Sequence, residues 1–355
     1  MAIPTHLHED ERKTTPMRPR APVAPPVGPG SRLGCYRLLD ELGSGGMATV
    51  YRAELTRNPD HTDSGPLGEA IAVKVLHEHL AREREHVEAF LDEGRIGLRL
   101  HHPAVCQVLD LGEEQGRPYV VMERIDGVSL ESLQRAVAVE PELVSASPAW
   151  PRHIAAVVAS LAEGLHAAHE LRGEDGRPLS LVHRDVTPEN LYVTSDGGVR
   201  LSDFGVARLD GRRRSTREGV IKGKLAYAAP ELFRGAVPDR RVDVWSLGVV
   251  LWELCTGQPL FRLTTDAEVT HAILSRELLP PSTFVAGVPK MLDQIVMQAL
   301  ARDPERRFAN ARALGNALRV WLSTRGGGVP GTKERQAWLR DLAVRVTRHE
   351  AMTVP

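Results

Sequence analysis

The stretch His183-Arg184-Asp185-Val186-Thr187-Pro188-Glu189-Asn190, followed by Asp203-Phe204-Gly205, is the most informative part of the chain. A phosphoryl-transfer site needs a carboxylate that orients a hydroxyl nucleophile, and it needs oxygen ligands for magnesium beside the nucleotide phosphates. Asp185 suits the first task, and Asn190 and Asp203 suit the second. Either motif alone would be weak evidence, so the interpretation depends on their order and spacing together with the motifs below.

The size and charge of the chain set broad limits on its fold and partners. Its 355 residues are enough for two domains or one bilobal unit, with ample apolar content for cores. The formal net charge of −1 gives no overall attraction to nucleic acid or anionic lipid. We therefore expect neither a nucleic-acid partner nor a membrane partner. The sequence gives no indication of the oligomeric state.

Cysteines and histidines offer little support for a metal or redox site. Cys35, Cys106 and Cys255 show no CxxC spacing, and we interpret them as reduced thiols of a cytosolic protein that serve as small buried side chains. The histidine pairs lack partners at ligand spacing, which favours a solvated surface over a metal site. These pairs are His6/His8, His77/His79 and His101/His102.

No targeting or membrane segment is visible. The first residues are polar and lack the apolar core of a secretory signal. The longest apolar stretch, residues 244–254, is about half the length of a membrane span and contains Glu253. We therefore expect a soluble, cytoplasmic protein.

The residue pattern divides the chain into four segments. Residues 1–33 are rich in proline and basic residues, which predicts a disordered arm because too little apolar surface is available for burial. Residues 34–122 are predicted to form a small antiparallel β lobe with one main helix, and residues 123–325 a larger, mainly helical lobe. This is an α+β, bilobal fold. The glycines at 326–328 indicate a hinge before a polar amphipathic extension, 326–355, to which the sequence assigns no role.

Hydrophobic periodicity places the individual elements within these segments. Strands are predicted at 36–39, 49–53, 70–76, 105–111 and 118–122. Helices are predicted at 81–100, 129–139, 151–170, 241–256, 266–275, 288–300 and 309–323.

A glycine-rich turn, Gly43-Ser44-Gly45-Gly46, lies between the first two predicted strands. Glycines at such a turn let the backbone approach phosphate oxygens without a side chain in the way. A dinucleotide-binding fingerprint is the alternative, but it requires a helix directly after the glycines. Here residues 49–53 continue as a strand and Ala48 stands in the place of the third glycine, so the pattern favours a β-hairpin over phosphates.

Lys74 lies on a predicted strand of otherwise apolar residues, Ile71-Ala72-Val73-Lys74-Val75. An ammonium group on a buried strand requires a counter-charge. Glu93, on the following predicted helix, is the natural partner, and the pair can position nucleotide phosphates. The alternative is a surface lysine at a strand edge, which the apolar neighbours on both sides make less favourable.

From residue 36 to about 323 the chain resembles the bacterial eukaryotic-like (Hanks-type) serine/threonine protein kinases. The resemblance covers most of the chain and is specific, because many short motifs occur in the family's order. They are the glycine turn at 43–50, Ala72-Val73-Lys74, Glu93, Val121-Met122-Glu123, His183-Arg184-Asp185, Asn190, Asp203-Phe204-Gly205, Ala229-Pro230-Glu231, Asp243-Val244-Trp245 and Arg307.

The resemblance implies ATP and Mg²⁺ as cofactors and protein serine or threonine hydroxyls as acceptors. Asp185 would be the catalytic base, Lys74 and Glu93 would position the phosphates, and Asn190 and Asp203 would hold the metal. The backbone of Glu123 and Ile125 would bond adenine, with Met122 at the back of the pocket. The full set implied to contact the nucleotide is Leu42, Gly43, Ser44, Gly45, Gly46, Val50, Ala72, Lys74, Met122, Glu123 and Ile125.

Three further residues are implied as structural supports of the large lobe. Glu231 and Arg307 would form a buried ion pair that braces the substrate-binding segment. Asp243, at the start of a helix, would tie the backbone of the catalytic loop.

Two departures from the family pattern fall close to the chemistry. The family usually has lysine two residues after the catalytic Asp, where this chain has Thr187. It usually has threonine after the glycine near the end of the activation segment, where this chain has Lys224. We hypothesise that the two exchanges compensate, with Lys224 reaching Asp185 and the γ-phosphate and Thr187 supplying the hydroxyl. The alternative is that both side chains face solvent and the enzyme is impaired.

Other residues leave regulation and activity open. Ser215 and Thr216, after three arginines, are candidate phosphorylation sites, and Arg184 could bind the phosphate group. A mobile hydrophilic loop is an equally good interpretation of this segment. Gly97 stands where the family has a larger apolar side chain, which could loosen the helix that carries Glu93. Two other functions compete with a protein kinase. One is a pseudokinase scaffold, favoured by Ala48, Thr187 and Gly97, and the other is a small-molecule phosphotransferase, disfavoured by the motif at 229–231.

Overall fold

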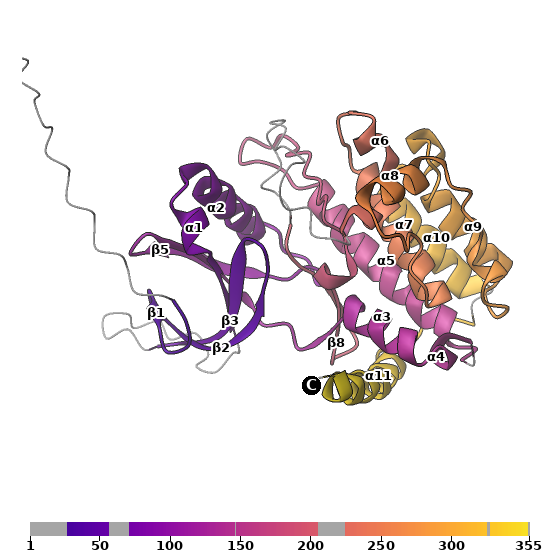
Figure 1. Cartoon of the computed structure of the whole chain (residues 1–355), viewed down its shortest axis with the longest axis horizontal. Helices are drawn as coiled ribbons and strands as arrows, with labels where there is room; N and C mark the ends of the chain where they lie inside the picture. The colour runs from indigo at the N-terminus through magenta and orange to yellow at the C-terminus, as the bar shows by residue number, and fades with distance from the viewer. Residues whose placement is uncertain (1–26, 57–70, 146, 205–223, 325–326, 354–355) are drawn as a thin grey trace, which may run out of the picture.

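A small β-rich lobe and a larger helical lobe lie side by side in the computed structural model (Figure 1). The structure describes residues 27–56, 71–145, 147–204, 224–324 and 327–353. The predicted α+β, bilobal fold is confirmed.

An antiparallel sheet forms the small lobe, with its strands in the order β1-β2-β3-β4-β6-β5. In its register, Val50 lies opposite Lys74 and Ala72 lies opposite Met122. Every residue of β4 is buried except Lys74, which is partly buried, so this strand places an ammonium group at the edge of an apolar layer. The strands are β1 (Arg32–Leu33), β2 (Tyr36–Ser44), β3 (Ala48–Leu55), β4 (Ile71–Leu76), β5 (Val108–Glu114) and β6 (Arg117–Glu123).

The main helix of the small lobe, α2 (Arg84–Arg99), packs against β5 and β6 and carries Glu93. It begins later than the predicted residue 81, because a separate short helix, α1 (Glu78–Ala81), precedes it. Gly97 is buried where α2 meets β5, and a Cβ atom there would lie 2.4 Å from Cγ2 of Val108. The space left by the missing side chain is thus occupied by Val108, which counts against the hypothesis that Gly97 loosens this helix.

Gly97→Leu should lower the free energy of unfolding by about 1–3 kcal/mol, because the new side chain overpacks the contact with Val108. This cost exceeds the gain of about 1 kcal/mol that replacing glycine in a helix interior brings. Denaturant unfolding of the variant measures the difference. Gly287→Leu is the matched control, since nothing lies within 4 Å of a Cβ atom at that position. An unchanged stability of Gly97→Leu would show that Val108 can move aside.

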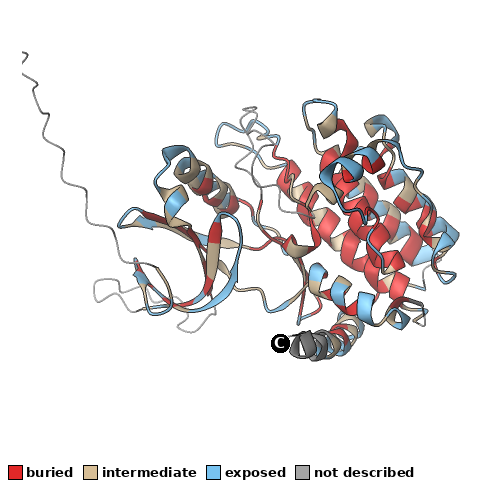
Figure 2. Ribbon diagram, in the orientation of Figure 1, coloured by how far each residue is buried: buried red, intermediate tan, exposed pale blue. Residues whose placement is uncertain are grey.

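The helices of the large lobe surround α7 (Arg241–Thr256), whose residues from Val242 onward are buried (Figure 2). The longest apolar stretch of the sequence is therefore a core helix. Across the described part of the chain, no helix is both long enough and apolar enough to cross a membrane. The other helices of this lobe are α3 (Leu130–Val139), α4 (Glu142–Ser145), α5 (Trp150–His169), α6 (Pro230–Phe233), α8 (Asp266–Ser275), α9 (Lys290–Ala299) and α10 (Ala311–Thr324).

A second, three-stranded sheet carries the catalytic loop and was not predicted from the sequence. It consists of β7 (Gly127–Ser129), β8 (Leu191–Thr194) and β9 (Val199–Leu201), with β8 in the middle. Strands of three or four residues are too short to show a two-residue alternation. Asn190 directly precedes β8 and Asp203 follows β9, so this hairpin sets the separation of the two predicted metal ligands.

Both ends of the described chain differ from the predicted segments. The proposed disordered arm, 1–33, is wrong for its last residues, because β1 pairs with β2 and Leu33 is buried in the core of the small lobe. The extension 326–355 contains α11 (Thr332–Thr353), which lies beneath α3 in Figure 1. Trp338 stacks on His153 of α5 with ring centroids 4.7 Å apart, and Leu339 and Leu342 join the core of the large lobe.

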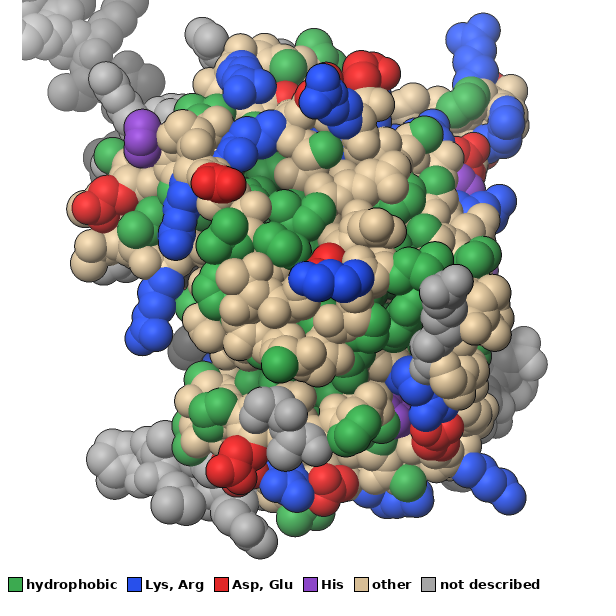
Figure 3. Space-filling model, turned by 90° about the vertical axis from the view of Figure 1, so that its right-hand side faces the viewer, with side chains coloured by type: hydrophobic (Ala, Val, Ile, Leu, Met, Phe, Trp, Pro, Cys, Tyr) green, Lys and Arg blue, Asp and Glu red, His purple; other side chains and the backbone are tan. Residues whose placement is uncertain are grey.

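The outer end of the large lobe shows charges of both signs. In Figure 3, basic and acidic side chains lie near one another around the rim of this face, and apolar side chains occupy much of its middle. No broad single-sign surface is visible on this face. This distribution agrees with the formal net charge of −1.

Candidate active site

Lys74 pairs with one carboxylate of its own lobe and with one of the large lobe. Its Nζ atom lies 3.2 Å from Oε1 of Glu93 on α2 and 2.6 Å from Oδ1 of Asp203 after β9. Burial alone would lower the pKa of Lys74, but the two carboxylates outweigh it, so the pKa is raised above its ordinary value. The ammonium group is therefore charged at neutral pH. The sequence predicted the Glu93 partner, whereas the bond to Asp203 depends on how the lobes meet.

The pKa values of the two carboxylates that contact Lys74 are shifted in opposite directions. Burial raises the pKa of Glu93, and Lys74 offsets only part of this effect. Burial would also raise the pKa of Asp203, but the charge and hydrogen bond of Lys74 hold it below the ordinary value. Asp203 has a φ of 53°, in the left-handed region, which is the kind of backbone strain that clusters at functional sites. Asp203 is thus an ionised carboxylate in a constrained backbone position.

Asp185 and Asn190 are held together within the catalytic loop. Nδ2 of Asn190 donates to the backbone oxygen of Asp185 at 2.9 Å and to its Oδ2 atom at 3.0 Å. With the amide nitrogen turned toward Asp185, the amide oxygen is left as an acceptor for a cation. The residues predicted as base and metal ligand therefore lie in direct contact.

Lys224 lies beside the predicted base. Its Nζ atom is 2.8 Å from Oδ2 of Asp185 and 2.7 Å from Oε1 of Glu189, and the side chain is 28% exposed. Burial would lower the pKa of Lys224, but Asp185 and Glu189 outweigh it and raise the pKa above its ordinary value. A charged ammonium group thus lies beside the carboxylate predicted to be catalytic, which is the contact that the hypothesis for Lys224 requires. The alternative of a solvated lysine does not hold.

Thr187 does not complete the exchange as hypothesised. Its side chain is buried, and its hydroxyl donates to Oε1 of Glu189 at 3.3 Å rather than to Asp185. Glu189 therefore bridges positions 187 and 224, a role that the sequence analysis missed. A carboxylate directly before Asn190, the predicted metal ligand, was the available signal.

Asp243 binds the backbone of the catalytic loop. Oδ2 of this buried carboxylate accepts from the backbone N–H of His183 and from His169, each at 2.8 Å, and Oδ1 accepts from the N–H of Arg184 at 2.8 Å. Burial would raise the pKa of Asp243, but these hydrogen bonds and the neighbouring histidines keep it below the ordinary value. Arg184 has a φ of 62°. The Asp243 carboxylate therefore holds the backbone of a strained loop, as the resemblance implied.

The predicted nucleotide contacts lie along the small lobe and the connection between lobes. Gly43 and Ser44 end β2, and Gly45 and Gly46 lie in the turn to β3. The N–H of Gly45 donates to the oxygen of Ala48 at 3.0 Å, which confirms the hairpin. Leu42 is exposed on β2, Val50 lies on β3 and Ala72 is buried on β4.

Met122 and Glu123 end β6, and Ile125 follows them toward the large lobe. The N–H of Glu123 donates to the oxygen of Gln107 at 2.9 Å, and Sγ of Cys106 donates to the carbonyl of Glu123 at 3.6 Å. Met122 also lines a cavity of about 30 Å³ together with Lys74, Glu93, Asp203 and Phe204. Met122 therefore lies close to Lys74, and its place at the back of a nucleotide pocket stays a prediction.

The donor set suits Mg²⁺ with a nucleotide. One ionised carboxylate, Asp203, and one amide oxygen, on Asn190, belong to the oxygen ligands that Mg²⁺ takes alongside phosphate oxygens and water. Lys74 adds a cation for phosphate oxygens. Gly205, Ser215 and Thr216 lie outside the described residues.

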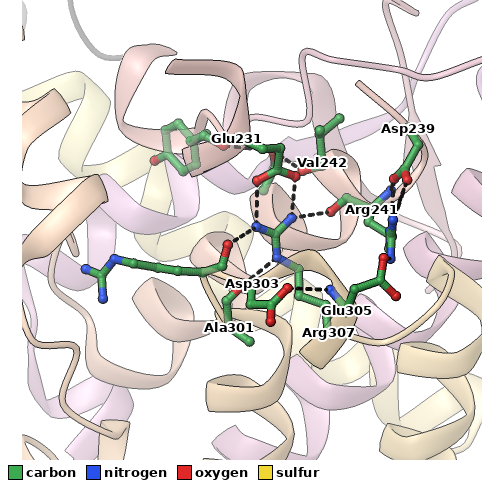
Figure 4. Close-up of polar contacts among 11 residues, drawn as sticks. Glu231, Asp239, Arg241, Val242, Ala301, Asp303, Glu305 and Arg307 are labelled. Carbon is green, nitrogen blue, oxygen red and sulfur yellow. Dashed lines mark hydrogen bonds and ion pairs between the residues drawn. The ribbon is translucent and has the colours of Figure 1, made fainter. Parts of the chain in front are cut away.

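Below the cleft, Glu231 and Arg307 form the expected ion pair (Figure 4). Nη1 and Nη2 of Arg307 bond Oε1 and Oε2 of Glu231 at 2.6 and 2.7 Å. The guanidinium also lies over the ring of Trp245, 5.2 Å from its centroid. This bidentate pair joins the start of α6 to the segment before α10 and so braces the end of the activation segment.

Glu231→Gln should lower the free energy of unfolding by about 3–5 kcal/mol, because it leaves the fully buried Arg307 without a counter-charge. Thermal and denaturant unfolding measure the change. The control is Glu305→Gln, which removes an exposed carboxylate paired with Arg241 and should cost less than about 1 kcal/mol. Equal stability of the two variants would contradict the bracing role.

This arrangement and the sequence agree with one family. Residues 36–318 match the family described as protein kinase domain. The chain belongs to the protein kinase family. Its relatives place this kinase domain among the bacterial Hanks-type kinases.

The kinase domain is similar to proteins of both named specificities. It is 36% identical to the tyrosine-protein kinase MasK of Myxococcus xanthus over 302 residues, which are 85% of this chain and 44% of MasK. It is 34% identical to the serine/threonine-protein kinase PknL of Mycobacterium tuberculosis over 283 residues, 80% of this chain and 64% of PknL. The chain thus spans less than two-thirds of the length of either relative.

A solved structure shares the fold. The crystal structure of the PknI kinase domain of Mycobacterium tuberculosis superimposes with a TM-score of 0.57 at 26% sequence identity, covering 82% of this chain and 98% of that domain.

Proposed function

We propose that this kinase domain transfers the γ-phosphoryl group of ATP, with Mg²⁺, to serine or threonine hydroxyls of proteins, itself included. The observation that carries the proposal is the proximity of four side chains: Lys74 bonds Asp203, and Asn190 bonds Asp185. The backbone joins the two pairs, because the N–H of Ser202, next to Asp203, donates to the oxygen of Asn190 at 2.9 Å. Because ATP is the substrate, we expect the domain to work in the cytoplasm.

The residues divide the reaction between them. Asp185 accepts the proton of the acceptor hydroxyl as the oxygen bonds to the γ-phosphorus and the bond to the bridging oxygen of ADP breaks. Lys74, oriented by Glu93, holds α- and β-phosphate oxygens. Bound Mg²⁺, held by Asn190 and Asp203, would neutralise charge on the phosphates.

Lys224 is proposed to supply the cation that the family's catalytic-loop lysine usually provides. Its Nζ atom lies 2.8 Å from Oδ2 of the proposed base Asp185, so its charge is close to the attacked phosphoryl group. Glu189 holds the ammonium group from the other side. The position of Lys224 weakens the pseudokinase alternative. Its ammonium group supplies, beside Asp185, the positive charge that Thr187 lacks.

Incubation with γ-labelled ATP and Mg²⁺, followed by phosphoamino-acid analysis, tests the proposal. We expect phosphoserine or phosphothreonine on the chain, loss of labelling with EDTA, and turnover of a good substrate at about 1–100 s⁻¹. Label found only on tyrosine would contradict the proposed serine or threonine acceptor. This outcome is a concrete alternative, because the chain is also similar to the tyrosine-protein kinase MasK. ATP binding without any transfer would instead support a nucleotide-binding scaffold.

A further inference from the structure

A second cavity lies away from the residues that line the nucleotide site. It has a volume of about 320 Å³, compared with about 30 Å³ for the cavity behind Lys74. Residues of α5, α10 and α11, the β8–β9 turn and the segment before Val105 form its walls. A volume of this size is within the range that small-molecule sites occupy.

Arg335 brings an unused donor to this cavity. It lies on α11 and lines the wall, and its Nε atom is buried without a hydrogen-bond partner in the described part of the chain. Buried guanidinium nitrogens are normally paired, because leaving one unpaired is costly. The guanidinium group of Arg335 as a whole, which lines the cavity and has an unpaired Nε atom, is the feature that points to a ligand.

A second arginine on the wall is already oriented. Nη1 of Arg319 donates to Oε1 of Glu163 at 2.5 Å, and Nη2 donates to the oxygen of Ala159 at 3.3 Å. Arg312 adds a longer contact to Glu163, with Nε 3.6 Å from Oε2. Glu163 is thus shared by two arginines, while Arg335 has no carboxylate partner among the described residues. The charge balance of this wall is positive.

His102 contributes a neutral donor rather than a further charge. The N–H of Ala104 donates to Nδ1 of His102 at 3.1 Å, so the proton of the neutral ring lies on Nε2. Burial lowers the pKa of His102, which keeps the ring neutral at physiological pH. The remainder of the wall includes apolar side chains, among them Val157 and Val199.

We propose that this cavity binds a small organic anion, with its carboxylate or phosphate group on Arg335 and its apolar body against Val157 and Val199. Charge-assisted bonds to a guanidinium suit either head group. A bound anion would contact both α11 and the β8–β9 turn, and so fasten the C-terminal helix to the catalytic lobe. This inference does not depend on the proposed phosphoryl transfer.

Isothermal titration with phenyl phosphate and with benzoate tests the site and distinguishes the two head groups. A non-hydrolysable ATP analogue with Mg²⁺ is present throughout, so that the nucleotide cleft is occupied. We expect at least one of the two probes to bind in a one-to-one ratio, and benzyl alcohol, which lacks the charge, to bind at least about 10-fold more weakly.

Two variants and a control locate the binding. Arg335→Gln should weaken binding about 10-fold or more, and Ser160→Phe should abolish it by placing a ring in the cavity, which Ser160 also lines. Arg340→Gln, an exposed arginine on the same helix, should bind like the unchanged chain. Failure of both probes to bind up to millimolar concentration, or equal affinity of Arg335→Gln and the unchanged chain, would overturn the proposal.

Discussion

Asp185→Asn should reduce kcat for phosphoryl transfer by about 10²- to 10⁴-fold, the range that a positioned general base contributes. The amide keeps the shape of the side chain and can still bond Asn190, but it cannot accept the proton of the acceptor hydroxyl. It also removes the negative charge beside Lys224. Initial rates of labelling with γ-labelled ATP, on a fixed protein acceptor, give the ratio.

Two further measurements separate catalysis from folding in this variant. Binding of a non-hydrolysable ATP analogue should change little, because Lys74, Asn190 and Asp203 remain in place. Asp175→Asn, an exposed carboxylate with 60% of its side chain accessible, should retain full activity and stability. A variant at position 185 that keeps a rate within about tenfold of the unchanged domain would rule out the assigned base.

Lys224→Met should lower kcat by about 10²- to 10³-fold with a smaller effect on the KM for ATP, the size seen when one positioned group that stabilises transition-state charge is lost. Methionine has a similar length and volume, so the loss of the ammonium group is the main change. Steady-state kinetics measures both constants. Lys290→Met is the control, because 85% of that lysine side chain is exposed.

A rescue experiment tests whether Lys224 replaces the usual lysine. Oε1 of Glu189 contacts both the Thr187 hydroxyl and the Lys224 ammonium, so positions 187 and 224 converge on one oxygen. The double variant Thr187→Lys/Lys224→Thr restores the arrangement usual in the family and should recover kcat to within about tenfold of the unchanged domain. If Lys224→Met alone is nearly neutral, or if the double variant is no more active than Lys224→Met, the compensation hypothesis is wrong.

Much of the fold follows from local patterns in the sequence. The helical period of the segments that became α5, α7 and α10 was strong enough to place them within a few residues. Burying Lys74 on an apolar strand is costly without a counter-charge, so the sequence predicted a carboxylate partner. Glu93 is that partner in the structure. Short strands such as β7 and the helix α11 were missed, because a few residues, or a mostly polar helix, give little periodic signal.

The sequence by itself determined the family, the order of the motifs and the residue types that phosphoryl transfer needs. Only the tertiary structure decided that Lys74 meets Asp203, a residue 129 positions away, that Glu189 joins Thr187 and Lys224, and that Arg335 faces a cavity. Periodicity and desolvation act on neighbouring residues, so they can be recognised along the chain. Distances between side chains from separate elements depend on how those elements pack, and the chemistry of the cleft depends on those distances.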